Sequence, residues 1–236
     1  VFRDWKAHGW VDMKQALAVS SDVYFYEIGG GYKDQEGLGI GLIDRYMSEF
    51  GFGKDMPDGF FKGVSGVIPT PEWKKENFNG EDWRIGDTYH TAIGQYGFQV
   101  SPIQAVRAVA SIANDGKFLS PSIFLGGNPE NYTQLGFSKD HFRIVREGMK
   151  LGVDQGIAIG LKSDFVTLGA KTGTAELGSR KQFVNSWITG FFPYNNPKYA
   201  FAIIMEKGPV SNTTGGVYIM RQILDWLSIN RPEYLK

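Results

Sequence analysis

The sequence has no cysteine among its 236 residues, which excludes disulfide bonds and thiolate ligands for a metal. It also lacks an excess of charge. Its 25 basic and 25 acidic side chains cancel, so nothing favours nucleic acid or an anionic membrane surface as a partner. No apolar run approaches the roughly 20 residues that cross a bilayer, and no signal peptide is visible. The composition, with 42% hydrophobic and 14% aromatic residues, is ample for a globular core.

The clearest strand pattern surrounds a Lys-Thr-Gly-Thr sequence at positions 171–174. Alternating apolar residues Val166, Leu168 and Ala170 precede it, and a polar turn over 178–182 separates it from a second apolar run at 187–192. Two such runs on either side of a turn predict a β-hairpin. The hairpin would carry Lys171 on its first strand.

Capping residues mark the starts of three helices. Asp12 followed by Gln15 fits a capping box, in which each side chain bonds the other residue's backbone N–H. Ser101 followed by Pro102 is a second start, because proline is favoured at the first helical position. Ser138 precedes a third segment, in which apolar residues recur every three or four positions.

The order of these elements favours an α+β fold. Residues 1–160 are expected to be mainly helical with loops, and 161–236 to form three sheet strands and a C-terminal helix. The three strands and that helix are expected at about 166–175, 184–193, 199–206 and 216–229.

Two finer expectations concern the last helix and the longest loop. The buried face of the last helix is expected at Ile219, Ile223, Trp226 and Leu227, which recur at helical spacing. Prolines at positions 57, 69 and 71 predict a long irregular loop over 54–81, and a second loop is expected over 126–131.

Several stretches together resemble a known family. Ser20-Ser21-Asp22 is followed by Val-Tyr-Phe-Tyr, the Lys-Thr-Gly strand lies far downstream, and 86–95 leads into the Ser101 helix. In this order the motifs resemble a class B penicillin-binding protein, a peptidoglycan D,D-transpeptidase. Arg-Asp-Trp-Lys at 3–6 and His-Gly at 8–9 are most similar to the elongation, or rod-shape, type. The resemblance runs from about Phe2 to about Trp226.

The resemblance implies a penicillin-binding transpeptidase or serine β-lactamase-like fold, with helices on both sides of an antiparallel sheet and an all-helical subdomain beside it. The family's nucleophile lies in a Ser-x-x-Lys motif, and no serine of this sequence has lysine three residues later. The nucleophile is therefore expected upstream of Val1. Residues 1–236 would be the C-terminal portion of a single transpeptidase domain, incomplete at its N-terminus and inactive alone, with the membrane anchor in the missing part.

The resemblance also implies roles for individual residues. Ser20 would relay a proton to the leaving group, and Asp22 stands where most relatives have asparagine. Lys171 would hold the substrate carboxylate electrostatically. Thr172 and Thr174 would offer hydroxyls to that carboxylate, and the Thr174 N–H would contribute to the oxyanion hole. Gly173 would let substrate lie against the backbone.

No cofactor is expected, and no metal. Some elongation-type relatives bind a metal with a cysteine in the middle of the Ser-x-Asp element, but Ser21 stands there beside the candidates Asp4 and His8. The expected partners are peptidoglycan stem peptides, β-lactams, the N-terminal part of the same protein and a membrane glycosyltransferase of the elongation machinery. The expected location is a bacterial membrane, with this domain on the periplasmic side.

Other interpretations remain open. Ser20 and Asp22 could merely cap a helix through 24–28, and Lys171 could be a solvated lysine on an edge strand. The same fold also carries D,D-carboxypeptidases and β-lactamases, for which glutamates at 72, 76 and 81 are candidate deacylation bases. A catalytically inactive β-lactam sensor or scaffold is the non-enzymatic alternative.

Overall fold

The computed structural model describes residues 2–56, 65–125, 131–178, 180–212 and 214–236. The chain forms two compact units, and each unit is discontinuous in sequence. The helical unit comprises Val1–Gly9 and Ser21–Gln104, and the sheet unit comprises Trp10–Ser20 and Ala105–Lys236. The expected boundary between a helical part and a sheet part was near residue 160. The two units divide the chain differently, because the helix before Ser21 and the helices that follow Gln104 belong to the sheet unit.

The helical unit is built around one close helix pair. Its helices are α2 (Asp22–Gly30), α3 (Gly39–Glu49), α4 (Pro71–Asn77) and α5 (Ile85–Ala92). A Cβ atom added at Gly29 in α2 would lie 2.4 Å from the Ala92 Cβ atom in α5, so glycine permits the approach. Nearby, the Tyr89 hydroxyl donates a hydrogen bond of 2.9 Å to the Gly31 carbonyl.

Helix α4 corrects the prediction of an irregular loop over 54–81. Thr70 is its N-cap, with Oγ1 accepting a hydrogen bond from the Trp73 N–H at 3.2 Å, and Pro71 is its first residue. Proline at the first helical position leaves no hydrogen bond unmade. The Thr-Pro pair is thus a helix start, although proline was interpreted as a breaker. Positions 57–64 of the predicted loop lie outside the described residues.

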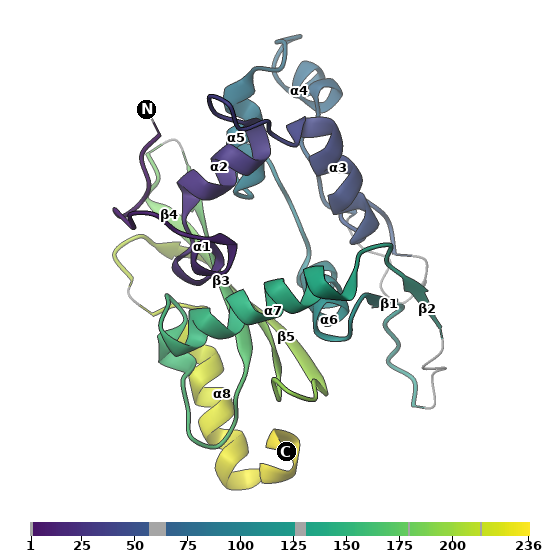
Figure 1. Ribbon diagram of the computed structural model, residues 1–236, viewed down its shortest axis with the longest axis vertical. Coiled ribbons are helices and arrows are strands. Elements are labelled where there is room, and N and C mark those ends of the chain that lie inside the picture. Colours follow the sequence, from purple (N-terminus) through teal and green to yellow (C-terminus); the bar gives the residue numbers. More distant parts are fainter. Residues whose placement is uncertain (1, 57–64, 126–130, 179, 213) are drawn as a thin grey trace. The chain divides into compact units, whose positions relative to one another are not determined.

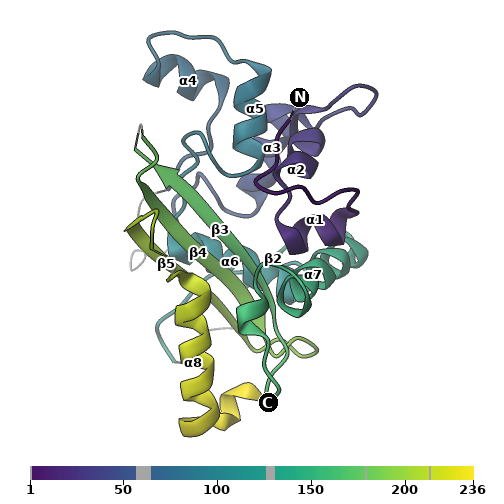
Figure 2. The ribbon, with the colours of Figure 1, turned by 90° about the vertical axis from the view of Figure 1, so that its left-hand side faces the viewer.

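The sheet unit contains a three-stranded antiparallel sheet in the order β3-β4-β5 (Figure 2). Its strands are β3 (Gly169–Leu177), β4 (Phe183–Phe192) and β5 (Tyr199–Pro209). The register of the first pair places Lys171 opposite Thr189. The predicted hairpin and all three predicted strands are confirmed, with bounds that shift by up to three residues at each end.

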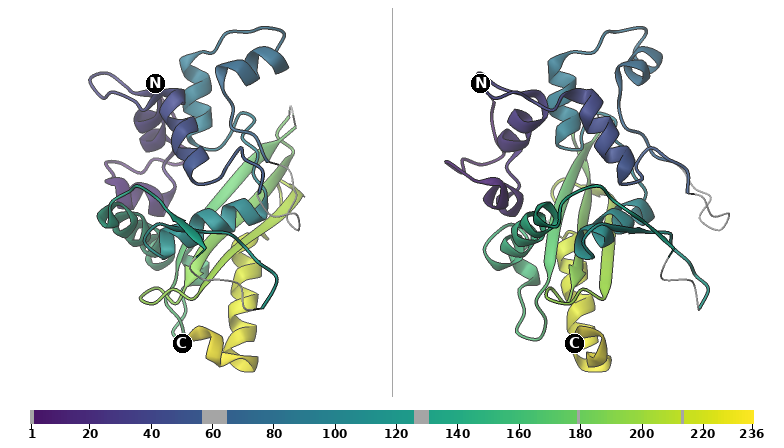
Figure 3. Two further views of the ribbon diagram at one scale, coloured as in Figure 1. Left: turned by 90° about the vertical axis from the view of Figure 1, so that its right-hand side faces the viewer. Right: turned by 45° about the vertical axis from the view of Figure 1, so that its right-hand side comes forward.

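Helices cover both faces of this sheet (Figure 3). Ile188 and Phe192 of β4 point to one face and pack with α8 (Gly216–Asn230), whereas Phe191 points to the other. Phe191 packs with α6 (Pro102–Ala113) and α7 (Lys139–Asp154). Helix α1 (Met13–Val19) in turn packs on α7 (Figure 1). The expected α+β architecture is confirmed.

The buried face of α8 is only partly the expected one, since Leu227 packs against the core but Ile223 and Trp226 do not. Met220 and Leu224 are buried at 1% and 0% exposure, whereas Ile223 and Trp226 are 42% and 56% exposed. The helix carries two apolar stripes, so periodicity alone could not choose between them. Gly216 decides the rotation, because a Cβ atom there would lie 2.8 Å from the Ile188 Cγ2 atom. The helix start is therefore pressed against the sheet on the side of Met220 and Leu224.

A small hairpin was missed in the sequence. Strands β1 (Lys117–Leu119) and β2 (Tyr132–Gln134) pair antiparallel, with Phe118 opposite Thr133. Most of the loop predicted between them, positions 126–130, lies outside the described residues. Two short 3-10 helices, η2 (Ile159–Leu161) and η3 (Pro232–Leu235), complete the sheet unit.

Candidate active site

Ser20 lies at the C-terminal end of α1, in the sheet unit. The predicted capping box opens this helix, since the Asp12 carboxylate accepts a bond from the Gln15 N–H at 2.8 Å and the Gln15 side chain accepts from the Asp12 N–H at 2.9 Å. Ser20 ends the helix in a left-handed conformation, with φ 56° and ψ 53°, and its N–H bonds the Ala16 carbonyl. This conformation is uncommon for residues other than glycine.

Lys171 meets Ser20 across 151 positions of sequence. The Lys171 Nζ atom donates a hydrogen bond of 2.7 Å to Ser20 Oγ and another of 2.8 Å to the Thr172 carbonyl. The lysine is half-buried on β3. A solvated edge-strand lysine is therefore not what the structure contains, and the serine and lysine expected to act together are in direct contact.

The rest of the Lys-Thr-Gly-Thr sequence is distributed over both faces of β3. Side chains alternate along a strand, so Lys171 and Gly173 share one face, and Thr172 and Thr174 share the other. Thr174 is exposed. Among the described residues β3 has β4 on one side and no strand partner on its other edge. This edge can accept an extended peptide, and the substrate-binding roles of Thr172, Gly173 and Thr174 remain predictions.

Asp22 belongs to the helical unit and is the first residue of α2. The N-cap of α2 is Ser21, whose Oγ atom accepts a bond from the Tyr24 N–H at 3.3 Å. The alternative in which Ser20 and Asp22 cap this helix is therefore wrong, since Ser20 ends α1 and Ser21 begins α2. The catalytic role of Asp22 stays a prediction.

Asp4 has a structural role that sequence reasoning missed. Its carboxylate accepts hydrogen bonds from the Ser21 hydroxyl at 2.6 Å, the Asp22 N–H at 3.2 Å and the Val23 N–H at 3.3 Å. These bonds satisfy donors that every helix N-terminus leaves unpaired. A contact 17 positions away leaves no periodic signal, so only the acidic residue itself could have hinted at it.

His8 lies beside Asp4, with 3.8 Å between His8 Nε2 and Asp4 Oδ1, and both side chains are about nine-tenths buried. His8 Nε2 has no hydrogen-bond partner in the described structure. Within the described residues no group of three or more His, Cys, Asp or Glu side chains is placed to hold a metal ion.

The helical unit contains a buried ion pair. Lys74 Nζ donates a hydrogen bond of 2.7 Å to Asp87, whose Oδ2 atom also accepts from the Arg84 N–H at 2.7 Å. The hydrogen bond to Asp87 raises the pKa of Lys74 against the lowering effect of burial. Burial alone would raise the pKa of Asp87, but the bonds from Lys74 and Arg84 hold it below its ordinary value.

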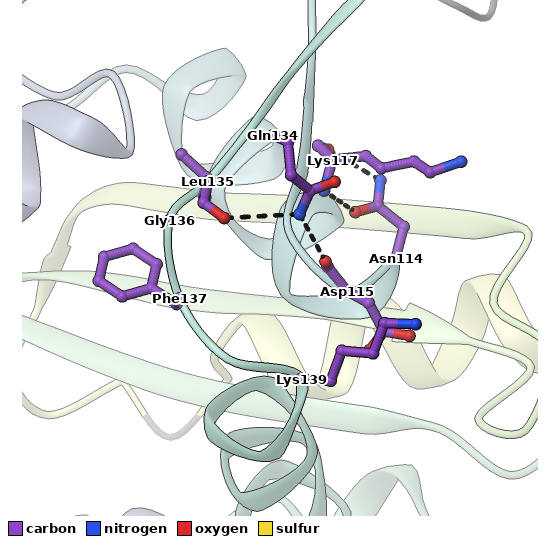
Figure 4. Close-up of a pocket in the computed structure, with 8 residues that line it drawn as sticks. All are labelled: Asn114, Asp115, Lys117, Gln134, Leu135, Gly136, Phe137 and Lys139. Atoms are coloured by element: carbon purple, nitrogen blue, oxygen red, sulfur yellow. Dashed lines mark hydrogen bonds between the residues drawn. The ribbon is translucent and has the colours of Figure 1, made fainter.

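The sheet unit also has an open pocket beside the β1–β2 hairpin (Figure 4). Polar side chains dominate its lining, which comprises Asn114, Asp115, Lys117, Gln134, Leu135, Gly136, Phe137 and Lys139. These groups fasten the local turn: Gln134 Nε2 donates to the Asp115 carbonyl at 3.0 Å, and Asn114 Nδ2 donates to the Lys117 carbonyl at 2.9 Å. None of the expected site residues lines this pocket.

The sheet unit thus combines helices on both faces of an antiparallel sheet with an edge-strand lysine bonded to a serine at a helix end. Comparison with known families makes the assignment specific. The chain belongs to the penicillin-binding protein transpeptidase domain family, whose model matches residues 1–225. The predicted family is thereby confirmed.

Individual relatives agree. Peptidoglycan D,D-transpeptidase MrdA of Salmonella typhimurium strain SL1344 is 31% identical over 257 residues, covering 96% of this chain and 40% of the relative. MrdA of Escherichia coli K12 is 28% identical, covering 97% of the chain and 39% of the relative. The chain thus spans about 40% of the length of these curated relatives.

Two solved structures are similar at the level of the fold and the sequence. Helicobacter pylori PBP2 in complex with MreC has a TM-score of 0.79 at 32% identity, covering 96% of this chain and 42% of that one. Pseudomonas aeruginosa PBP2 in complex with WCK 5153 has a TM-score of 0.79 at 29% identity, covering 98% of this chain and 53% of that one.

Proposed function

We propose that these residues are part of a penicillin-sensitive peptidoglycan D,D-transpeptidase that cross-links stem peptides during cell elongation. The hydrogen bond of 2.7 Å between Lys171 Nζ and Ser20 Oγ carries the proposal, because it joins two motifs that acyl transfer needs together. Relatives named as peptidoglycan D,D-transpeptidase MrdA support the reaction and its role in elongation.

The reaction proceeds through a covalent acyl-enzyme. A serine from a Ser-x-x-Lys motif, which these 236 residues do not contain, attacks the carbonyl between the two terminal D-alanines. A carbon–oxygen bond forms, the peptide carbon–nitrogen bond breaks, and the leaving D-alanine amine takes up a proton. An amine of a second stem peptide then attacks the ester, which forms the cross-link and regenerates the serine.

Ser20 delivers the proton to the leaving amine. Lysine ammonium is a donor only, so Ser20 Oγ accepts in its bond with Lys171 and gives its own proton to a different partner. The lysine charge stabilises the serine oxygen while that proton is transferred. Ser20 is re-protonated from the nucleophile's motif, which receives the proton that the attacking serine loses.

Strand β3 holds the substrate. Lys171 attracts the terminal carboxylate, with hydroxyls of Thr172 and Thr174 as additional donors. The N–H of Thr174 contributes one half of the oxyanion hole, where preorganised donors stabilise the charge that develops on the carbonyl oxygen. Asp22 supplies a carboxylate at the position where most relatives have asparagine.

The partners and location follow from the same assignment. The relative from Helicobacter pylori is seen in a complex with MreC, and a protein similar to MreC and a membrane glycosyltransferase are the partners we propose here. We place the domain on the periplasmic side of a bacterial membrane. Among the described residues, no helix has both the length and the apolar character needed to cross a bilayer.

The decisive experiment measures whether the full-length protein transfers the acyl group to an amine acceptor peptide or to water. Purified enzyme is given a D-Ala-D-Ala stem pentapeptide with and without an amine acceptor peptide, and products are identified by mass. A transpeptidase forms cross-linked dimer that benzylpenicillin abolishes. Tetrapeptide as the dominant product, even with acceptor present, would identify a D,D-carboxypeptidase, and neither product would identify a sensor or scaffold.

A further inference from the structure

Helix α7 approaches α1 through a row of glycines at a spacing of four residues. Gly148 and Gly152 lie in α7 and Gly156 follows its end. A Cβ atom added at Gly148 would lie 2.8 Å from the Leu17 Cδ1 atom, and one at Gly156 would lie 2.2 Å from the Ala18 carbonyl oxygen. Positions i and i+4 share a helix face, so this face of α7 is the surface on which α1 rests.

Further contacts fix α1 along that surface. The Ile157 N–H donates a hydrogen bond of 3.1 Å to the Ala18 carbonyl. The Lys14 Nζ atom donates a hydrogen bond of 3.3 Å to the Glu147 carboxylate. Ala16 and Ala18 are buried at 0% and 2% exposure. Because Ser20 directly follows this helix, the position of α1 on α7 determines where its hydroxyl lies.

Gly152 contacts both segments that carry the Ser20–Lys171 pair. A Cβ atom there would lie 3.6 Å from the Ala18 Cα atom, two residues before Ser20, and 3.3 Å from the Ala170 carbonyl oxygen, directly before Lys171. An alanine side chain would meet Ala18 at an ordinary van der Waals distance, but the Ala170 carbonyl would have to move by a few tenths of an ångström. Packed interiors transmit such displacements, since they contain few voids to absorb them.

We propose that Gly152 is a positioning residue for acyl transfer: its missing side chain sets the 2.7 Å separation between Ser20 Oγ and Lys171 Nζ. This role rests on the proposed function, because the separation matters for rate only if the pair relays a proton. Gly152 touches neither substrate nor the reacting atoms and acts through the two segments it separates.

Gly152→Ala in the full-length protein is the test, with Gly41→Ala as the matched control. Gly41 lies in α3, and a Cβ atom there meets nothing within 4 Å. Alanine is the better helix former at both positions, so neither substitution should lower the melting temperature by more than a few degrees. A purely structural role therefore predicts two similar, stable variants.

We expect Gly152→Ala to slow acylation by benzylpenicillin about tenfold, since a misplacement of about 1 Å can cost about 10²-fold in rate and the displacement here is smaller. The loss should fall on the acylation rate constant and leave the pre-covalent dissociation constant unchanged. Gly41→Ala should acylate at the wild-type rate. Equal rates for all three proteins, or a loss confined to the dissociation constant, would overturn the positioning role.

Crystal structures of the same variants separate this inference from the proposed function. Gly152→Ala should show a Ser20 Oγ to Lys171 Nζ distance longer than in the Gly41→Ala protein, whether or not either protein is acylated. An unchanged distance would overturn the inference alone. A wild-type protein that benzylpenicillin does not acylate would instead contradict the proposed function.

Discussion

Ser20 combines an unfavourable backbone conformation with a direct contact to Lys171. Its left-handed φ of 56° is a conformation that costs a residue with a Cβ atom about 1–2 kcal/mol. The same turn ends α1 and directs the hydroxyl to Lys171, 2.7 Å away. Strain of this kind is frequently retained at functional positions.

Replacing Ser20 should separate stability from activity. Ser20→Gly removes the hydroxyl and also relieves the strain, whereas Ser20→Ala removes the hydroxyl alone. Both substitutions should reduce the acylation rate by ~10²–10⁴. In denaturant unfolding, the glycine variant should be about 1 kcal/mol more stable than the alanine variant. An alanine variant with wild-type acylation would contradict the relay role.

At this scale the sequence could predict residues that belong to motifs. Lys171 and Ser20 were recognised because their neighbours in sequence resemble a family. Asp4 and Gly152 were missed, because their importance lies in contacts with residues far along the chain. A carboxylate that caps a distant helix and a glycine that spaces two segments leave no local pattern.

Helices and strands were largely predictable, because capping residues and alternation are local signals. Helix α7 begins after Ser138 as predicted, with the Ser138 side chain accepting a bond from the His141 N–H. The face of α8 was not predictable, since the helix is apolar on two stripes and Gly216 selects one of them through its contact with Ile188.

The two stripes of α8 predict different outcomes for one substitution. Leu224→Ala should destabilise the full-length protein by about 2–5 kcal/mol, because Leu224 is fully buried against the sheet. Ile223→Ala, which removes an apolar side chain that is 42% exposed, should have a clearly smaller effect. Denaturant unfolding of both variants measures the difference. Equal losses of stability would contradict the claim that Leu224, and not Ile223, faces the sheet.

The Lys74–Asp87 pair predicts how stability depends on pH. Because the pKa of Asp87 is lowered from its ordinary 3.8, its contribution is present above about pH 4 and is lost as the pH falls further. Because the pKa of Lys74 is raised above 10.5, its contribution is present below that pH and is lost as the pH rises through the folded-state value.

Lys74→Met should therefore lower the melting temperature at neutral pH, and the difference from wild type should shrink in acid. Lys75→Met is the matched control, since Lys75 pairs with Asp82 at 3.5 Å while both side chains are mostly exposed. Exposed pairs contribute little, so this control should melt close to wild type at every pH. A difference for Lys74→Met that stays constant down to pH 2 would refute the ion-pair account.

For the molecule as a whole, the fold class and family could be predicted, but the division into units could not. The chain leaves the helical unit after Gly9, re-enters it at Ser21 and returns to the sheet unit after Gln104. Periodicity shows that α1 and α6 are helices. Their membership of the sheet unit depends on complementary surfaces such as the α7 glycines, which only the folded structure reveals.

Lys171 and Ser20 form the working pair of the proposed acyl-transfer site. The most direct measurement is the rate at which the full-length Lys171→Ala protein is acylated by a fluorescent penicillin. Lys181→Ala is the control, because Lys181 is an exposed lysine in the turn of the same hairpin. We expect a loss of ~10²–10⁴ in acylation rate for Lys171→Ala and wild-type acylation for Lys181→Ala. Acylation of Lys171→Ala at the wild-type rate would contradict this expectation.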